Sequence, residues 1–193
     1  MVVGPQYCLQ DYVDLTITEK VNDAADGFYT VTDVKSRLIF RIEHRIFSFR
    51  DKRILFDASE EPVITLQEKI MTAHGRWQAF RGESTNPKDL LFSAKRSSLT
   101  QNLSFDLDVF LASNRSEQKC DFKIKGDFFD RSCTVFLGDS AKAVAQVRKK
   151  HSVKNVIFGD DSFGLTIHPY VDYAFVVSLI VILDEIYKVE DED

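Results

Sequence analysis

Hydrophobic and polar residues alternate along most of the chain, which is the pattern of β-strands that bury one face and expose the other. The alternation is clearest at Phe105–Leu111 and at Cys120–Lys125. Short strands separated by turn-sized polar breaks indicate an antiparallel sandwich or barrel rather than a parallel α/β sheet. The other predicted strands are Val13–Thr18, Phe28–Thr32, Leu38–Ile42, Arg53–Asp57, Val63–Glu68, Arg76–Arg81, Leu90–Lys95, Cys133–Leu137, Ala143–Lys149, Val153–Phe158 and Phe163–His168.

One segment fits two structures. Ala141–Lys150 is rich in Ala, Gln, Arg and Lys, which favour a helix, whereas Ala143, Ala145 and Val147 alternate as in a strand. We interpret the segment as a strand because its neighbours along the chain are strands.

The C-terminal region departs from the alternation. Ten of the 11 residues in Tyr173–Leu183 are apolar, and the pattern continues as one helix to Tyr187. The apolar run rises only about 16–17 Å, against about 30 Å of membrane hydrocarbon, so no transmembrane span is predicted. Asp172 is a suitable N-cap residue, and Ser178 can donate a hydrogen bond to the carbonyl of Ala174.

A helix that is apolar on every side must be surrounded by other apolar groups. We therefore predict a core helix enclosed by the sheet. A barrel filled in this way has no large internal ligand cavity, so function is expected on the outer surface or at a rim. The core residues expected on this helix are Tyr173, Phe175, Val176, Leu179, Ile180 and Leu183.

No break in the chain resembles an interdomain linker, and the length fits one domain. We expect a short N-terminal segment over residues 1–10, a single domain over residues 11–187 and an acidic tail over residues 188–193.

Composition supports a large core and a reducing compartment. The 193 residues are 44% hydrophobic and include 16 Phe, which excludes a disordered chain. The net charge of −5 disfavours general nucleic-acid binding, so direct DNA contact is not predicted. Three cysteines without paired spacing indicate reduced thiols, and no secretory signal is visible; we expect a cytoplasmic protein.

Motifs for catalysis are absent from the sequence. The four histidines lack metal-ligand spacing, and there is no nucleophile elbow. Gly159–Gly164 has the outer glycines of a phosphate loop without the following Lys and Ser/Thr, which fits a β-turn better. Asp106 and Asp108 share a strand face and could hold a metal or share acid–base chemistry, but on an alternating strand such a pair is more often the solvent-facing side. We predict no enzyme, no cofactor and no metal.

Two basic clusters are the candidate binding residues. Lys95 and Arg96 close one predicted strand, and Arg148, Lys149 and Lys150 close another. In a net-acidic protein such clusters can receive an anionic lipid headgroup. The alternative is that they are solvated strand ends that protect the sheet from aggregation.

Several segments together resemble the plant LURP-one-related proteins. The resemblance runs in order from about Val2 to Tyr187. It is carried by Asp51–Asp57 (DKRILFD), Gly75–Gly82 (GRWQAFRG), Asp89–Ser98 (DLLFSAKRSS), Cys120–Gly126 (CDFKIKG), Arg131–Cys133 (RSC) and Val171–Asp184 (VDYAFVVSLIVILD).

This resemblance implies the fold of the tubby C-terminal domain and the phospholipid scramblases: a closed antiparallel barrel of about twelve strands around a central hydrophobic C-terminal helix. It also implies a membrane-tethered regulator in plant defence that binds phosphoinositides at the cytoplasmic face of the plasma membrane and passes to the nucleus on release. The calcium-binding and cysteine-rich segments of scramblases are not apparent in this chain. The alternative hypothesis is a soluble protein-interaction scaffold in defence signalling without lipid affinity, which the acidic net charge favours.

Overall fold

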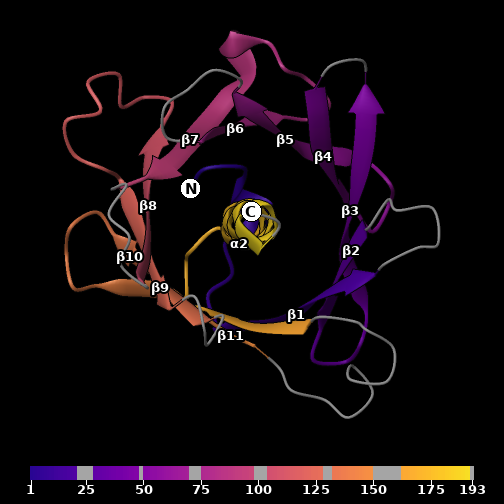
Figure 1. The fold of residues 1–193 in the computed structure, drawn as a ribbon. Helices are drawn as coiled ribbons and strands as arrows, with labels where there is room; N and C mark the ends of the chain where they lie inside the picture. The colour runs from indigo at the N-terminus through magenta and orange to yellow at the C-terminus, as the bar shows by residue number, and fades with distance from the viewer. Residues whose placement is uncertain are drawn as a thin grey trace.

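The computed structural model describes residues 1–20, 28–47, 50–69, 75–97, 104–127, 132–149 and 162–191. Twelve strands in these ranges form one closed barrel in which each strand pairs antiparallel with its neighbours, and β1 closes the ring against β12 (Figure 1). The strands are β1 (Val13–Lys20), β2 (Phe28–Asp33), β3 (Leu38–Phe47), β4 (Arg50–Asp57), β5 (Pro62–Lys69), β6 (Arg76–Arg81), β7 (Leu90–Arg96), β8 (Ser104–Leu111), β9 (Phe122–Asp127), β10 (Ser132–Leu137), β11 (Ala143–Lys149) and β12 (Ser162–Ile167).

The alternating sequence pattern gives each strand one face towards the inside of the barrel and one face towards the outside. Tyr29 and Val31 of β2 face inward and are at most 1% exposed, whereas Thr30 between them faces outward and is half-buried. The register keeps inward residues opposite one another, as in the pair Val31 and Phe40. The predicted barrel is confirmed, and the ambiguous segment is β11. The predicted strand Val153–Phe158 and residues 159–161 of the predicted turn lie outside the described residues, and residues 162–164 belong to β12.

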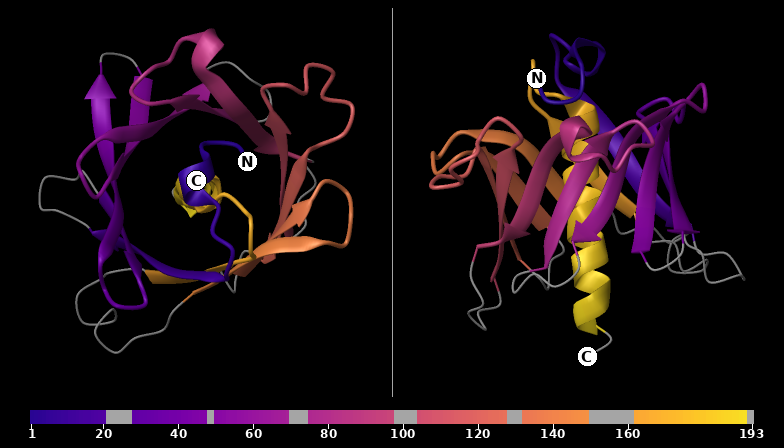
Figure 2. Two further views of the ribbon diagram at one scale, coloured as in Figure 1. Left: turned by 180° about the vertical axis from the view of Figure 1, so that it is seen from behind. Right: turned by 90° about the horizontal axis from the view of Figure 1, so that it is seen from above.

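Helix α2 (Tyr173–Asp191) runs through the centre of the barrel (Figures 1 and 2). The ring of Phe175 contacts Phe92 and Phe122 on the wall, with centroid distances of 5.0 and 4.9 Å. Because strands surround the helix on all sides, its apolar residues can cover its whole circumference. Among the six residues expected in the core, Phe175, Val176, Leu179, Ile180 and Leu183 are at most 5% exposed, and Tyr173 is half-buried.

The helix begins at an acidic cap that also holds the N-terminal segment. One carboxylate oxygen of Asp172 accepts a hydrogen bond from the Phe175 amide (3.2 Å), which confirms the predicted N-cap. Its other oxygen accepts the backbone amides of Val2 (3.0 Å), Val3 (2.7 Å) and Gly4 (3.2 Å). One buried carboxylate therefore joins the start of the chain to the start of the helix.

The helix continues beyond the boundary that the sequence suggested. Residues 188–191, expected in the acidic tail, are helical. The Ser178 hydroxyl donates to the Ala174 carbonyl (2.8 Å), as predicted. Within the described ranges, the structure contains no helix with the length and hydrophobicity needed to span a membrane.

The two ends of the barrel carry different parts of the chain (Figure 2, right). The upper end carries the N-terminal segment, the turns after the even-numbered strands and the start of α2. The lower end is where the odd-numbered strands and α2 finish.

The outer wall also divides into two regions. On β4 to β8, which we call the covered wall, outward-facing side chains are buried: Ile54 is 1% exposed, Thr65 0% and Phe80 4%. On β9 to β12, β1 and β2, which we call the bare wall, the outward side chains of Lys125, Gln146 and Arg148, among others, are exposed.

Candidate functional site

Both predicted basic clusters lie at the lower end, because β7 and β11 run in the same direction and finish there. Lys95 and Arg96 end β7. Arg148 and Lys149 end β11, and Lys150 lies outside the described residues. Three strands separate β7 from β11, so a spacing of about 4.8 Å per strand places the clusters about 19 Å apart along the wall. They share a rim without forming one site.

The cluster on β7 is already engaged in contacts within the protein. The Lys95 ammonium lies 3.4 Å from a carboxylate oxygen of Glu117 and 4.7 Å from the centre of the Phe110 ring. Arg96 is half-buried at the end of the strand. Lys95 thus packs over the covered wall, which reduces the positive charge that it offers to a ligand.

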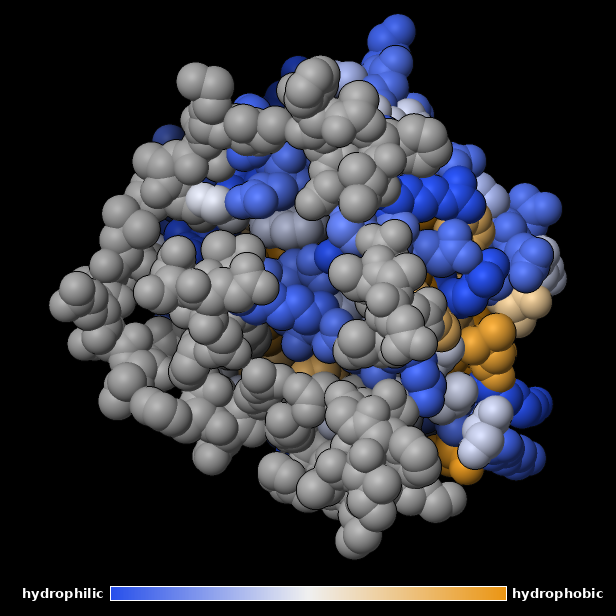
Figure 3. Space-filling model, turned by 45° about the vertical axis from the view of Figure 1, so that its right-hand side comes forward, coloured by the Kyte–Doolittle hydropathy of each residue, from blue (hydrophilic) through white to orange (hydrophobic). Residues whose placement is uncertain are grey.

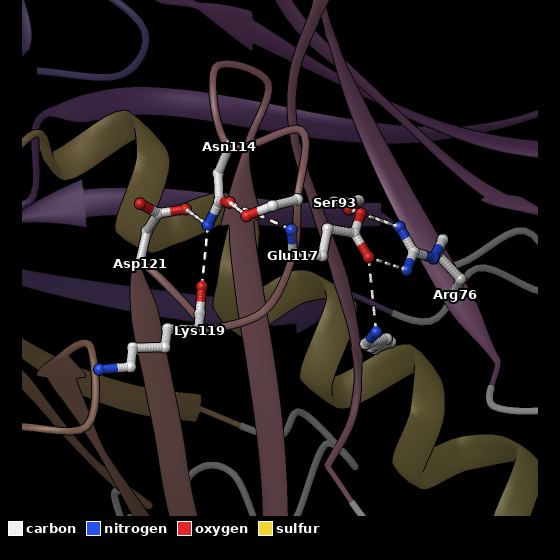
Figure 4. Close-up of polar contacts among 8 residues, drawn as sticks. Arg76, Ser93, Asn114, Glu117, Lys119 and Asp121 are labelled. Atoms are coloured by element: carbon white, nitrogen blue, oxygen red, sulfur yellow. Dashed lines mark hydrogen bonds and ion pairs between the residues drawn. The ribbon is translucent and has the colours of Figure 1, made fainter.

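Glu117 is the centre of an ion-pair clasp on the covered wall (Figure 4). Its two carboxylate oxygens each lie 2.6 Å from a guanidinium nitrogen of Arg76. Arg76 also donates to the Ser93 hydroxyl at 3.0 Å. The hydrogen bond from Arg76 lowers the pKa of the Glu117 carboxyl and raises the pKa of Arg76 itself. This bidentate geometry is the strong form of an arginine–carboxylate contact.

The segment that carries Glu117 is fixed by its own hydrogen bonds. The Asn114 side-chain amide donates to the Lys119 carbonyl (2.8 Å) and to Asp121 (2.9 Å), and its oxygen accepts the Glu117 amide (3.2 Å). Figure 4 shows these side chains turned towards one another between β8 and β9. The connection after β8 therefore forms a firm outer layer, and we assign it a structural role.

Arg148 has a different environment on the bare wall. It is exposed and lines a surface hollow of about 430 Å³ together with Lys125. In the described part of the chain, neither cation has an acidic partner. The Lys125 ammonium lies 6.0 Å from the Phe136 ring centre. The other lining residues are Gly126, Ser132, Cys133, Thr134, Gln146 and Val147, which include no acid.

A second hollow of about 470 Å³ lies on the opposite side of Arg148. It is lined by Arg148 and Gln146 of β11, crosses β12 and β1, and reaches Val34 in the turn after β2. Asp14 lies within it and accepts a hydrogen bond from the Thr166 hydroxyl at 2.7 Å. Arg148 is therefore an accessible cation that borders two depressions, each large enough for a small-molecule ligand.

Sequence reasoning selected Arg148 but did not single out Lys125. The alternation of β9 places Lys125 on the outward face, but pairing between β9, β10 and β11 is needed to bring it to the same hollow as Arg148. Lys149 is the last residue of β11.

A buried charged cluster at the lower end of α2 is not visible in the sequence. The Tyr29 hydroxyl oxygen lies 2.7 Å from a carboxylate oxygen of Asp184 and 2.7 Å from one of Glu185, so its single proton is shared between the two acids. The Lys188 ammonium lies 2.6 Å from that hydroxyl oxygen and 2.6 Å from a carboxylate oxygen of Glu19. The charged end of the helix is thereby tied to β1 and β2.

Arg53 of β4, a strand of the covered wall, also contacts this cluster. A guanidinium nitrogen of Arg53 lies 2.5 Å from Glu185. Burial favours the neutral form of Glu185, but the charge and hydrogen bond of Arg53 outweigh it, and the pKa is lowered. For Glu19 burial outweighs the Lys188 contact, so its pKa is raised. Every acid and base in the cluster has a partner within it, while the Nε and Nη1 atoms of Arg53 are buried without a hydrogen-bond partner. The pairing across the cluster fits helix anchoring.

The other candidate groups show no arrangement for chemistry. Asp108 faces the Lys123 ammonium at 3.4 Å, so it belongs to an ion pair on the outer face. Within the described ranges, no group of three or more acidic, His or Cys side chains could hold a metal ion. Burial raises the pKa of the Cys133 thiol to about 12 and that of Cys120 to about 11, which keeps both thiols protonated and unreactive.

Comparison with known proteins gives the family. The sequence profile described as LURP-one-related matches residues 13–184. The chain belongs to this family. The profile begins with β1 and ends inside α2, so it covers the barrel and the buried part of the helix.

Named members of the LURP-one-related family have similar length and sequence. Protein LURP-one-related 15 of Arabidopsis thaliana is 47% identical over 97% of this chain and 86% of its own length. Protein LURP-one-related 10 is 45% identical over 100% and 99%. Protein LURP1 from the same plant is 46% identical over 97% and 90%.

A solved structure supports the fold of this LURP-one-related chain. The crystal structure of an Arabidopsis thaliana protein superposes with a TM-score of 0.74 at 40% identity, and the match covers 96% of this chain and 98% of that one. The family expected from the sequence is therefore confirmed. The names of these relatives state no enzymatic activity.

Proposed function

We propose that the protein is a non-catalytic binding module that docks reversibly on anionic phospholipid at the cytoplasmic face of a membrane. The observation that carries this proposal is the pair of exposed cations Lys125 and Arg148. They border one hollow of about 430 Å³ that has no acidic lining residue. Ser132, Thr134 and Gln146 supply hydroxyl and amide groups to the same hollow, which suits a polar anionic headgroup.

The remaining basic residues of the lower rim extend this proposal. Lys149 and Lys150 follow Arg148 directly in the sequence, and we include them in the docking surface on that ground alone, because Lys150 lies outside the described residues. Lys95 and Arg96 contribute less in this proposal, because Lys95 is paired with Glu117 and Arg96 is half-buried. The bare wall therefore supplies the main contact.

The expected strength of docking is modest. A basic residue close to an anionic membrane contributes about 1 kcal/mol, and this attraction fades over a Debye length of about 10 Å at 0.1 M salt. A few such residues give binding that is reversible and salt-sensitive, which suits a regulator that is released from the membrane.

The finer parts of the proposal follow the resemblance stated above. Phosphoinositide as the lipid, release to the nucleus and a role in plant defence are supported by likeness to tubby-like proteins. Catalysis, lipid flipping and direct DNA contact are not part of it. The competing proposal, a defence scaffold without lipid affinity, is supported by the net charge of −5.

Sedimentation with vesicles that contain phosphoinositide tests this function. Reversal of both cations, Lys125→Glu with Arg148→Glu, is expected to weaken binding about 100-fold or more, because four units of charge change near the membrane. The matched control, Lys88→Glu with Arg115→Glu, alters the net charge equally at exposed positions beside the covered wall.

Three results are distinguishable. Loss of binding in the Lys125/Arg148 variant alone supports the proposal. Equal binding of both variants shows that the cations are wrongly assigned. Wild-type protein that fails to bind at low salt rejects lipid docking and favours the scaffold.

A further inference from the structure

The exposed large hydrophobic residues in the described part of the chain all lie at the upper end of the barrel. None of them belongs to the outer wall between the ends. The connections after the odd-numbered strands, at the lower end, lie almost entirely outside the described residues, so the comparison is between the upper end and the wall. The exposed hydrophobic residues are Met1 (79% exposed), Leu9 (49%), Tyr12 (61%), Val34 (77%), Leu38 (43%), Leu137 (43%) and Tyr170 (69%). Clustering of this kind on a surface marks a contact site rather than chance exposure.

Six of these residues form one arc above the bare wall. They belong to the turn after β10, the link between β12 and α2, the approach to β1, and the turn between β2 and β3, which are neighbours around the barrel. We call Leu9, Tyr12, Val34, Leu38, Leu137 and Tyr170 the apolar arc. The turns above the covered wall contain no exposed large hydrophobic residue in the described ranges. Among the coloured atoms in Figure 3 most are hydrophilic, and several separate hydrophobic residues reach the surface on the right, the side turned towards the upper end.

The arc is held in place by contacts within the protein. The Tyr170 amide donates to the Leu9 carbonyl at 2.7 Å. The ring of Tyr12 packs on His168 with a centroid distance of 5.1 Å. These contacts fix the backbone while the tyrosine side chains remain exposed.

Lysines border the arc. Lys35 and Lys142 are exposed beside it, next to Val34 and near Leu137, and neither has an ion-pair partner among the described residues. The acids Asp11, Asp14 and Asp139 are exposed on the same side, and Asp139 pairs with the Lys123 ammonium at 2.7 Å. The upper edge of this side is therefore mixed in charge, and the hollow without an acidic lining residue lies lower on the bare wall.

The apolar arc and the cations of the bare wall are continuous. The hollow of about 470 Å³ runs from Val34 in the arc to Arg148 on the wall. One side of the barrel thus combines tyrosines and aliphatic residues at its upper edge with the exposed cations Lys125 and Arg148 below them, and Asp14 lies in the hollow that connects the two.

We propose that the barrel lies on its side at the membrane, with the bare wall against lipid headgroups and the apolar arc inserted into the bilayer interface. This inference rests on the proposed function and adds an orientation and a set of inserting residues. Tyrosine side chains with adjacent lysines are typical of the membrane–water boundary, where the ring is half-immersed and the ammonium reaches the headgroups.

The cations below the arc favour an anionic bilayer over a second copy of the chain as the occupant. The hollow between Lys125 and Arg148 has no acidic lining residue. A symmetric dimer brings the same patch of each copy together and would offer this hollow the same cations. An anionic bilayer instead offers it complementary charge.

Quenching of tryptophan fluorescence by lipids brominated on their acyl chains tests the orientation. The single natural tryptophan, Trp77, is 7% exposed and packs in the barrel core, so wild-type protein serves as the unquenched reference. Tyr12→Trp and Val34→Trp each place a probe in the arc at an exposed site. Lys88→Trp places a matched probe at the upper end above the covered wall.

On vesicles of brominated phosphatidylcholine with anionic lipid, the two arc probes are expected to lose most of their added emission, and the Lys88→Trp probe to keep it. Binding of all variants without quenching of the arc probes overturns the orientation but leaves lipid docking intact. Equal quenching of all three probes also overturns it. Absence of vesicle binding by wild-type protein rejects both proposals.

A second measurement uses affinity. Tyr12→Ser with Val34→Ser is expected to lower vesicle affinity about tenfold, because each large apolar side chain gains free energy on leaving water. The remaining binding should become more sensitive to salt. Unchanged affinity and unchanged salt dependence would contradict insertion of the arc.

Discussion

The covered wall and the bare wall are built from strands of similar length, yet their outward residues are used differently. On the covered wall, Lys95 lies 4.7 Å from the Phe110 ring centre and is paired with Glu117. On the bare wall, Lys125 lies 6.0 Å from Phe136 and has no acidic partner among the described residues. The same combination of lysine and phenylalanine is packed beneath a loop in one case and open to solvent in the other.

This difference separates structural charges from available ones. An ion-paired cation with a buried aromatic beneath it contributes to folding, and its removal is felt in stability. An exposed cation beside a polar hollow contributes little to folding, so its presence there needs another explanation, which we propose is ligand binding.

The largest expected effect on the free energy of unfolding concerns the contacts of α2 with β4 of the covered wall and with β1 of the bare wall. Glu185→Gln leaves the guanidinium of Arg53 without its carboxylate in a buried place, which should cost about 3 kcal/mol. Glu19→Gln should cost less than about 1 kcal/mol, since burial already favours the neutral form of Glu19, as its raised pKa indicates. Urea unfolding of both variants measures the difference. Equal losses would show that the helix is held no more firmly by Arg53 than by β1.

Truncation of the two outward phenylalanines should separate the walls next. Phe110 is 4% exposed, so Phe110→Ala should lower the free energy of unfolding by about 3 kcal/mol. Phe136 is half-buried, and Phe136→Ala should cost about 1 kcal/mol. Thermal unfolding curves would report both values. A larger loss for Phe136 would reverse the comparison.

Removal of the clasp carboxylate should have a moderate effect. Glu117→Gln weakens the bidentate contact with Arg76 and leaves Lys95 unpaired, at a cost of about 1–2 kcal/mol. Hydrogen exchange of residues 112–121 should accelerate in this variant. Exchange that matches the wild type would mean that Asn114 and Asp121 hold the segment without the ion pair.

The clasp also predicts a dependence of stability on pH. The pKa of Glu117 is lowered in the folded protein by the Arg76 hydrogen bond, relative to an ordinary value of 4.5. Its stabilising contribution is therefore complete above pH 4.5 and is lost as the pH falls through the lowered folded value. The difference in the free energy of unfolding between the wild type and Glu117→Gln should become smaller as the pH falls below about 4.5. A difference that is constant with pH would contradict the ion pair.

The smallest effect is expected on the bare wall. Arg148→Gln and Lys125→Gln should each change the free energy of unfolding by less than about 0.5 kcal/mol, because neither side chain is buried or ion-paired. Guanidinium titrations would detect a larger change. A loss of more than about 1 kcal/mol would mean that these cations are structural after all.

The fold could be predicted from the sequence because the strand pattern and the helix pattern require the same architecture. Alternation in β2 and β9 predicts one buried face, and the uniformly apolar run after Asp172 can be satisfied only by a complete enclosure. The limit of the buried helix was less certain, because Lys188 lies within a helical turn and is held by Glu19, a residue far away in the sequence.

The site was less accessible to sequence reasoning. Lys95 and Arg148 look alike as strand-ending cations, and what separates them is whether a distant carboxylate reaches them, as Glu117 reaches Lys95. The hollow between Lys125 and Arg148 likewise depends on how β9, β10 and β11 pair. The apolar arc consists of single residues in turns that only barrel closure gathers on one side.

Amide hydrogen exchange with and without anionic vesicles tests the central claim most directly, because it reports both walls in one experiment. We predict that vesicles protect β9 to β12 and the turn at residues 34–38, and leave β4 to β8 and the segment at residues 112–121 unchanged. Protection confined to the covered wall, or spread equally over both walls, would contradict a lipid-facing bare wall.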